Sequence, residues 1–204
     1  MYENFVIILS APSGTGKSVL TGMLLKNYSN IKLSCSATTR PAREGEIDGF
    51  HYYFISQDRF DGMIANSELL EYAGVYGKSY GTPKSEVDKN WALGNDVLLD
   101  IDWQGNLSVS KQITDRRKIL RIFVLPPSVK ELRNRLNNRG ADSPEIIEKR
   151  MMDAKNTILH YKDYDYVVVN DNLEECFKKI CVLIDAKRIE NTDFSKIANK
   201  LLDE

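Results

Sequence analysis

Histidine, cysteine and long apolar runs are all scarce in this chain of 204 residues. Each shortage argues against a particular class of protein. There are two histidines and three cysteines, and the cysteines have neither metal-ligand spacing nor the even number of a disulfide framework. No apolar run approaches the ~18 residues of a membrane span, and no basic segment precedes an apolar run at the start. We therefore expect neither secretion nor membrane spanning, and a cytoplasmic protein.

An excess of charge of either sign is also lacking. Lys and Arg total 28 and Asp and Glu total 29, which gives a formal net charge of −1. This balance gives the whole molecule no attraction to nucleic acid or to an anionic membrane surface, so we expect neither as a partner. The length suits one core with one or two insertions, and the sequence leaves homo-oligomer formation open.

The start of the chain carries the strongest motif. The apolar run 5–9 leads into a glycine-rich segment made of Ala11, Pro12, Ser13, Gly14, Thr15, Gly16, Lys17 and Ser18. An apolar strand that runs into such a turn, ends in Lys-Ser and continues as a helix is typical of a P-loop, which binds nucleotide phosphates. Gly14 and Gly16 let successive N–H groups curl around a phosphate. Lys17 would bind the β- and γ-phosphates, and the Ser18 hydroxyl would bind Mg²⁺. The strict motif has glycine where Ala11 stands, and alanine there requires only a negative φ.

Strands and helices alternate along most of the remaining chain. We expect strands at 97–101, 119–125 and 166–169, and helices over 18–26, 83–93, 128–139, 143–161 and from the residues after Asp171 to about 189. This alternation predicts an α/β fold with a parallel sheet covered by helices on both faces. In the first helix Val19, Leu20, Met23 and Leu24 share one side.

Two segments depart from this alternation. Residues 32–82 are rich in Tyr, Phe and Gly, with short alternating runs such as 50–55, which predicts a small β-rich insertion. Residues 191–204 place Phe194, Ile197 and Leu201 at helical spacing, which predicts a short amphipathic helix.

Two acids lie at the end of the strand predicted at 97–101. In parallel α/β sheets, ligands bind beyond the carboxyl ends of the strands. Asp100 and Asp102 are therefore candidates to hold Mg²⁺, directly or through water, beside a P-loop nucleotide. The alternative, open for Asp102 in particular, is that the carboxylate caps the next helix.

Arginines form a second group of candidates. Arg135 and Arg139 lie four residues apart on one helical face, Arg150 lies on the next helix, and Arg40 and Arg43 lie in the insertion. For any one of them a solvated surface position is the simpler interpretation. Together with a P-loop, however, guanidinium groups around a transferred phosphoryl group are what phosphoryl transfer requires.

The lack of an evident general base is informative. Neither His51 nor His160 has a catalytic-looking context. A hydroxyl or water acceptor would require a base or a water-positioning residue, whereas a phosphate acceptor is already ionised near neutral pH. The enzyme then has only to align two polyanions and cancel their repulsion. The pattern indicates a nucleoside monophosphate kinase.

The segment Thr38–Phe54 closely resembles the signature of guanylate kinases of the bacterial type, which are P-loop nucleoside monophosphate kinases. The resemblance extends over most of the chain, including 80–82, 99–105, 126–128 and 169–171. Bacterial members also have alanine at the position of Ala11. The family implies Mg²⁺-dependent transfer of the γ-phosphoryl group of ATP to GMP, with dGMP as a further expected acceptor.

The family also implies three parts within one unit over residues 4–188. These parts are a P-loop core (1–34, 83–136 and 159–204), a GMP-binding insertion (35–82) and a helical lid (137–158).

Residue roles follow from the same match. The family implies that the GMP phosphate is held by Arg40, Arg43, Tyr52 and Tyr80, and that guanine is recognised by Ser36, Glu71 and Thr82. It implies that Arg135, Arg139 and Arg150 close over the phosphates, that Asn170 lies near the ATP adenine, and that Asp100 lies near GMP and the metal.

Glu71 has a chemical rationale for this role. Guanine presents N1–H and N2–H₂ as adjacent donors, and one carboxylate can accept from both. Adenine would leave a lone pair facing that carboxylate, and unpaired buried groups are the basis of strong discrimination. Sequence alone does not favour Glu71 over Glu68; the family match does. Two alternatives stay open, namely a non-catalytic peptide-binding module and a kinase with another acceptor, such as AMP or a ribosyl phosphate.

Overall fold

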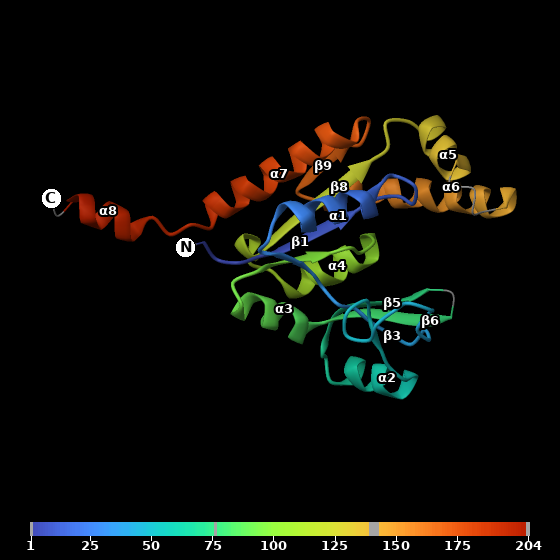
Figure 1. The fold of residues 1–204 in the computed structure, drawn as a ribbon, viewed down its shortest axis with the longest axis horizontal. Helices are drawn as coiled ribbons and strands as arrows, with labels where there is room; N and C mark the ends of the chain where they lie inside the picture. Colours follow the sequence, from blue (N-terminus) through green and yellow to red (C-terminus); the bar gives the residue numbers. More distant parts are fainter. Residues whose placement is uncertain (1, 76, 139–142, 203–204) are drawn as a thin grey trace.

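A five-stranded parallel sheet lies at the centre of the protein in the computed structural model, which describes residues 2–75, 77–138 and 143–202 (Figure 1). In spatial order its strands are β2 (Ile31–Leu33), β7 (Asp96–Leu99), β1 (Val6–Ser10), β8 (Ile119–Leu125) and β9 (Tyr166–Val169). Every neighbouring pair is parallel. β1 is central and all five of its residues are buried, so the loop that follows β1 emerges at the middle of the sheet edge.

Helices cover both faces of this sheet. One face is covered by α1 (Lys17–Asn27) and α7 (Leu173–Glu190), and the other by α3 (Lys84–Ala92) and α4 (Trp103–Gln112). Alternation along β1 explains the two layers, because successive side chains of a strand point to opposite faces. Ile7 and Leu9 pack in the cluster with α1 and α7, whereas Val6 and Ile8 pack in the cluster with α3 and α4.

The segment between β2 and α3 forms a separate, smaller sheet. Its spatial order is β4 (Tyr53–Phe54), β3 (Ala37–Thr38), β6 (Lys78–Pro83) and β5 (Leu69–Val75). One helix, α2 (Gln57–Ala65), packs on it through Phe60 and Met63. This insertion lies below the core in Figure 1, and β6 runs directly into α3.

The part of the chain after β8 brings a helical pair to the P-loop end of the molecule. α5 (Val129–Asn138) and α6 (Pro144–Ile158) share a small apolar cluster that includes Leu132, Leu136 and Met151. A 3₁₀ helix, η2 (Leu159–Asp163), follows α6 directly and leads to β9, and a shorter one, η1 (Arg116–Lys118), precedes β8. None of the helices in the described part of the chain has the length and apolar character of a membrane span.

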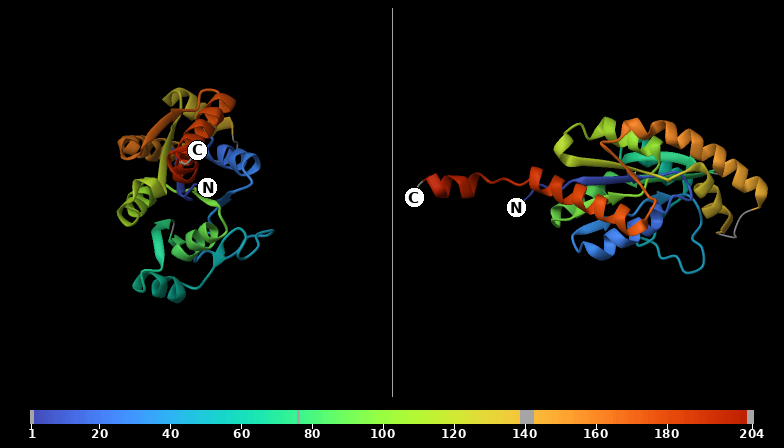
Figure 2. Two further views of the ribbon diagram at one scale, coloured as in Figure 1. Left: turned by 90° about the vertical axis from the view of Figure 1, so that its left-hand side faces the viewer. Right: turned by 90° about the horizontal axis from the view of Figure 1, so that it is seen from above.

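The last helix, α8 (Ser195–Leu202), extends away from the rest of the protein (Figures 1 and 2). Phe194, which directly precedes α8, and Ile197 and Leu201 on the helix are all more than half exposed. The amphipathic helix predicted for 191–204 is therefore confirmed, over a shorter range.

Most of the expected core elements are confirmed, and the differences have local causes. β8 and β9 match the predicted ranges, and the other elements differ by a few residues at their ends. Val19 lies on the apolar side of α1 in the sequence pattern, but it is 53% exposed because it lines the cavity over the phosphate loop. Only Tyr53–Phe54 of the run 50–55 forms a strand, and no range was predicted for β2, α2 or α4.

Candidate active site

The loop between β1 and α1 has the backbone shape that the motif predicts. Gly14 has φ +88° and Gly16 has φ +100°, values that side chains with a Cβ rarely adopt. The N–H of Thr15 donates to the carbonyl of Pro12 at 3.2 Å and closes the turn. α1 begins directly at Lys17, so the free N–H groups of its first turn and its positive dipole end face the loop.

A cavity of about 740 Å³ opens over this loop. It is lined by Ala11, Pro12, Ser13, Gly14, Gly16, Lys17, Ser18, Val19, Arg135 and Asn138. Seven of the eight predicted loop residues thus share one cavity; the eighth, Thr15, is fully buried beneath it. A volume of this order, with N–H groups and a lysine at its floor, suits a nucleotide.

α5 packs directly against the loop and places Arg135 at its edge. A Cβ on Gly14 would lie 2.9 Å from Leu136 Cδ2, so the close approach of α5 also requires glycine there. The Arg135 guanidinium donates to Glu131 at 2.9 Å and to the Asn170 carbonyl at 3.1 Å. Ser128 accepts from the N–H of Glu131 at 3.0 Å and caps the helix.

Asn170 supports the phosphate loop from below. Its side-chain Nδ2 donates to the Thr15 carbonyl at 2.7 Å, and the residue is 3% exposed. A Cβ on Gly16 would meet the same Nδ2 at 2.7 Å. The structure therefore gives Asn170 a contact with the loop that was not predicted, while its contact with adenine stays a prediction.

Lys17 and Asp100 form an ion pair across the end of the sheet. Asp100 directly follows β7, the neighbour of β1. The phosphate loop and Asp100 therefore lie together at the carboxyl ends of these parallel strands, as expected. Asp102 instead accepts from the N–H of Gly105 at 2.9 Å and is the N-cap of α4. The alternative left open for Asp102 is thus the one observed.

One face of the insertion, here called the arginine face, carries Arg40, Tyr52 and Tyr80, with Arg43 close to Arg40 in sequence. Its arginines are held by Glu46, an acid that was not among the predicted site residues. Glu46 accepts two parallel hydrogen bonds from Arg40, at 2.8 and 2.9 Å, and a third from the backbone N–H of Arg43 at 2.7 Å. The rings of Tyr52 and Phe54 lie 5.5 and 5.6 Å from the Arg40 guanidinium. The only sequence signal for Glu46 was its place inside the signature, six residues after Arg40.

Three of the predicted phosphate ligands lie together on this face. The Tyr52 and Tyr80 rings meet edge to face at 6.1 Å, and Arg40 lies over Tyr52. Burial raises the pKa of Tyr52, and the nearby Tyr80 and Asp100 add to the rise. Because Asp100 follows β7 of the core, its effect places the insertion face and the core site within electrostatic range of each other. Arg43 is exposed, and its backbone N–H donates to Glu46.

Glu71 and Thr82 form a buried polar pair at the base of the insertion. They are partners in the antiparallel register of β5 and β6, and Thr82 Oγ1 donates to Glu71 Oε1 at 2.7 Å. Glu71 is 8% exposed and Thr82 is fully buried. Burial raises the pKa of Glu71, and the hydrogen bond from Thr82 opposes that rise. Ser36, the third predicted guanine ligand, is half-buried just before β3.

One of the predicted arginines lies elsewhere. Arg150 is on α6 and, among the described residues, is not part of the cavity lining that includes Arg135. Arg139 falls outside the described residues.

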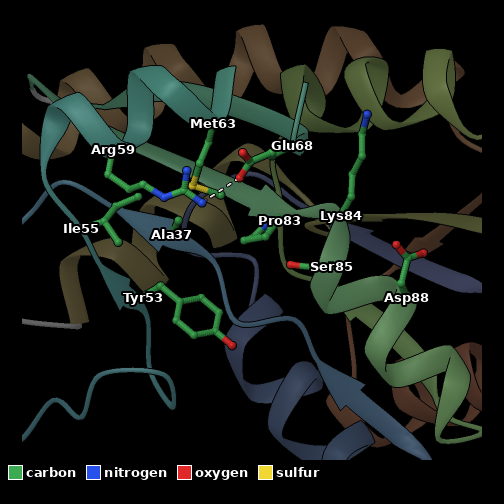
Figure 3. A pocket seen from close by; sticks show the side chains of 10 residues that line it. All are labelled: Ala37, Tyr53, Ile55, Arg59, Met63, Glu68, Pro83, Lys84, Ser85 and Asp88. Atoms are coloured by element: carbon green, nitrogen blue, oxygen red, sulfur yellow. Dashed lines mark hydrogen bonds and ion pairs between the residues drawn. The ribbon is translucent and has the colours of Figure 1, made fainter. Parts of the chain in front are cut away.

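The small sheet has a second pocket, of about 410 Å³, on the face opposite Tyr52 and Thr82 (Figure 3). It lies against α2 and the start of α3, and it is lined by Ala37, Tyr53, Ile55, Arg59, Met63, Glu68, Pro83, Lys84, Ser85 and Asp88. Arg59 and Glu68 form an ion pair at its edge, at 2.8 Å. Tyr53 and Pro83 are the sequence neighbours of Tyr52 and Thr82, so strand alternation separates this pocket from the predicted GMP residues.

No group of three or more His, Cys, Asp or Glu side chains in the described ranges could hold a metal ion by itself. The oxygen ligands near the loop are the Ser18 hydroxyl, which lines the cavity, and the Asp100 carboxylate beside Lys17.

Known proteins match this chain along nearly its whole length. The family model described as guanylate kinase matches residues 3–187. A guanylate kinase of Rickettsia prowazekii is 47% identical over 93% of this chain and 94% of its own. Another, of Sphingopyxis alaskensis, is 45% identical over 91% of this chain and 83% of its own. The crystal structure of guanylate kinase from Anaplasma phagocytophilum superposes with a TM-score of 0.71 at 34% identity, over 92% of this chain and 88% of that one.

Proposed function

The chain belongs to the guanylate kinase family and is an ATP:GMP phosphotransferase, and we propose that Glu71 and the arginine face of the insertion bind GMP while the loop Ala11–Ser18 binds ATP. The observation that carries this assignment is the buried pair of Glu71 and Thr82. One Glu71 oxygen is occupied by Thr82, and a carboxylate oxygen has further lone pairs. The carboxylate can therefore accept N1–H and N2–H₂ of guanine while Thr82 keeps it in position.

The GMP phosphate would lie against Arg40, Arg43, Tyr52 and Tyr80. The Tyr52 and Tyr80 hydroxyls supply donors next to the Arg40 guanidinium, and charge-assisted hydrogen bonds to phosphate are the strong ones. Ser36 would complete recognition of the base at the other end of the nucleotide. The separation of a carboxylate for the base from arginines for the phosphate fixes the direction in which GMP binds.

ATP would occupy the cavity over the phosphate loop. The N–H groups of the loop and of the first turn of α1 would bind its phosphates, and Lys17 would cancel charge at the β- and γ-phosphates. Arg135 at the cavity edge and Arg150 on α6 would act on the transferred group, together with Arg139. Asn170 would lie near the adenine, with its Nδ2 holding the Thr15 carbonyl.

Mg²⁺ fits the donors present. Ser18 offers a hydroxyl and Asp100 a carboxylate, and Mg²⁺ usually takes one or two such ligands together with substrate phosphates and water. When bound, the ion would neutralise charge on the β- and γ-phosphates. The Lys17–Asp100 pair would hold the two side chains in place for that role.

The acceptor oxygen of GMP is ionised near neutral pH, so no side chain has to remove a proton. The protein's contribution is to hold the two phosphates in line and to offset their mutual repulsion with Lys17 and the arginines. Closure of the insertion (35–82) and the lid (137–158) over the core would exclude water that could otherwise hydrolyse ATP. A cytoplasmic location and use of dGMP remain predictions of the same proposal.

The first test is release of ADP in a coupled assay with Mg·ATP and, in parallel, GMP, dGMP, AMP, CMP and UMP. We expect turnover with GMP and dGMP only. Selective turnover with GMP in the wild type that is lost in Glu71→Gln but kept in Glu68→Gln supports the guanine site. Turnover with AMP or a pyrimidine nucleotide at a similar rate would remove Glu71, Thr82 and Ser36 from base recognition.

A further inference from the structure

The first turn of α4 approaches the Glu71 carboxylate closely. A Cβ on Gly105 would lie 3.2 Å from Glu71 Oε2 and 3.1 Å from Ile101 Cβ. Gly105 is also fixed by its own N–H, which donates to the Asp102 carboxylate at the N-cap. The space between Gly105 and Glu71 is therefore too small for a side chain, and a shift of the Glu71 carboxylate toward α4 would press on this turn, because tightly packed groups transmit small shifts.

The same turn touches the segment that follows the lid helix. The Trp103 ring stacks on the His160 ring, with centroids 3.6 Å apart and planes inclined by only 5°. Asn106, which is fully buried, donates through Nδ2 to the Asp163 carbonyl at 3.2 Å. His160 Nδ1 lies 3.0 Å from Asp163 Oδ2, so η2 is tied internally as well as to α4.

η2 lies between the lid helix and the core. Its first residue, Leu159, follows the last residue of α6 without a connecting loop, so η2 and the Arg150-bearing helix are one continuous rod. Immediately after η2, Tyr164 is 8% exposed and packs 4.9 Å from the Phe123 ring of β8. The rod is therefore anchored at Tyr164, and the contacts of His160 and Asp163 with α4 lie on its lid side.

We propose that Trp103 and His160 are positioning residues that couple guanine occupancy at Glu71 to the position of Arg150 on α6. The inference rests on the proposed function, because it takes Glu71 as the guanine ligand and Arg150 as a phosphate ligand. In this arrangement GMP holds Glu71, Glu71 fixes the first turn of α4, and the Trp103–His160 stack fixes the angle at which α6 leaves the core. The contact thus favours phosphate binding by the lid only when guanine is present.

The coupling can be measured from either ligand. The factor by which bound ATP increases the affinity for GMP equals the factor by which bound GMP increases the affinity for ATP. The dissociation constant of GMP is measured by calorimetry with and without Mg·AMPPNP, and the ratio of the two constants is compared between proteins. We expect a ratio of several-fold in the wild type. In Trp103→Leu we expect the ratio to fall to about one, while GMP affinity in the absence of AMPPNP changes by less than about twofold.

His160→Leu removes the other ring of the stack and should lower the ratio of the GMP dissociation constants in the same way. It replaces Trp103→Leu in the test if that variant does not fold. Trp103→Phe, which keeps an aromatic face, should restore most of the ratio. Trp91→Phe is the matched control. It alters the other tryptophan, on α3, which packs against the core on the α3 and α4 face of the central sheet. In the Arg150→Ala background, Trp103→Leu should lower kcat no further, because the contact acts through Arg150.

An unchanged ratio in both Trp103→Leu and His160→Leu overturns the inference, as does an equal loss of both affinities with the ratio preserved, or a ratio of one in the wild type. Failure of the proposed function can be told apart from failure of this inference by calorimetry of the wild type alone. If Glu71 does not recognise guanine, the wild type would bind GMP and AMP equally.

Discussion

The guanidinium of Arg40 and the carboxylate of Glu46 face each other through two parallel hydrogen bonds of 2.8 and 2.9 Å. The hydrogen bonds from Arg40, followed by that from the Arg43 backbone, lower the pKa of Glu46 from its usual 4.5 to about 2. Because the pKa is lowered by folding, the contribution of the pair to stability is complete above about pH 4.5 and is lost as pH falls toward 2. Glu46 therefore holds Arg40 in one orientation at every pH at which the enzyme would be assayed.

Glu46→Gln should raise the KM for GMP by roughly tenfold, because an amide accepts through one oxygen only and its NH₂ group opposes the guanidinium. The KM for ATP should change little, since Glu46 lies on the insertion and not at the phosphate loop. Steady-state kinetics with each substrate varied in turn measure both constants. Glu44→Gln, a change at an exposed acid two residues earlier, is the control. Equal KM values for GMP in the two variants would mean that Glu46 does not orient Arg40.

Glu71 predicts a pH dependence that is specific to GMP. Burial raises the pKa of Glu71 above the usual 4.5, so the carboxyl is protonated at a higher pH than surface carboxyls. A protonated carboxyl presents a donor to the guanine donors, so kcat/KM for GMP should fall on the acid side while the KM for ATP stays constant. Glu71→Gln should lose roughly a hundredfold in kcat/KM for GMP and should no longer show this acid limb. An identical pH profile in the variant would assign the limb to another group.

Lys17→Ala should lower kcat by roughly a thousandfold, the scale of losing a group that stabilises developing charge in the transition state. GMP binding, measured by calorimetry, should be retained because Lys17 lies at the ATP cavity. Lys26→Ala, in the last turn of the same helix, provides a control for loss of charge on α1. Turnover near the wild-type rate in Lys17→Ala would exclude the loop from catalysis.

Asn170→Ala should destabilise the protein by about 1–2 kcal/mol, because it leaves the buried Thr15 carbonyl without its donor. It should raise the KM for ATP more than the KM for GMP, since the loop that Asn170 supports lines the ATP cavity. Asn170→Asp keeps the shape of the side chain but places an acceptor against the carbonyl, so it should be at least as damaging. Denaturant unfolding gives the stability, and Asn134→Ala, at an exposed position of α5, should match the wild type.

Sequence analysis predicts the parts of this protein in which local pattern and tertiary fold agree. The strands β8 and β9 are short runs of apolar, largely β-branched residues ended by proline or by asparagine, and their ranges were predicted to the residue. The phosphate loop was predictable because its glycines, lysine and serine are consecutive. The choice of Glu71 and Thr82 as guanine ligands required the family match, and their hydrogen bond to each other was not predicted, because the register that joins them depends on a hairpin fold.

What sequence analysis missed depends on contacts between distant segments or on weak local signals. α2 had a usable signal, since Ser56 accepts from the N–H of Arg59 as an N-cap and Phe60, Met63 and Ile64 have helical spacing, but the aromatic residues before it favoured strands. The support of Thr15 by Asn170 joins residues 155 positions apart, and no local pattern encodes it. The exposure of Val19 follows from the cavity beside it, which only the packing of α5 defines.

The alternation of residues across the small sheet limits how the length of the insertion can change. Tyr52 and Thr82 belong to one face and their neighbours Tyr53 and Pro83 to the other. Loss or gain of a single residue within β4 or β6 would exchange the two sets and turn the guanine ligands toward α2. Natural variants and engineered changes of length inside these strands should therefore be tolerated only when residues are gained or lost in pairs.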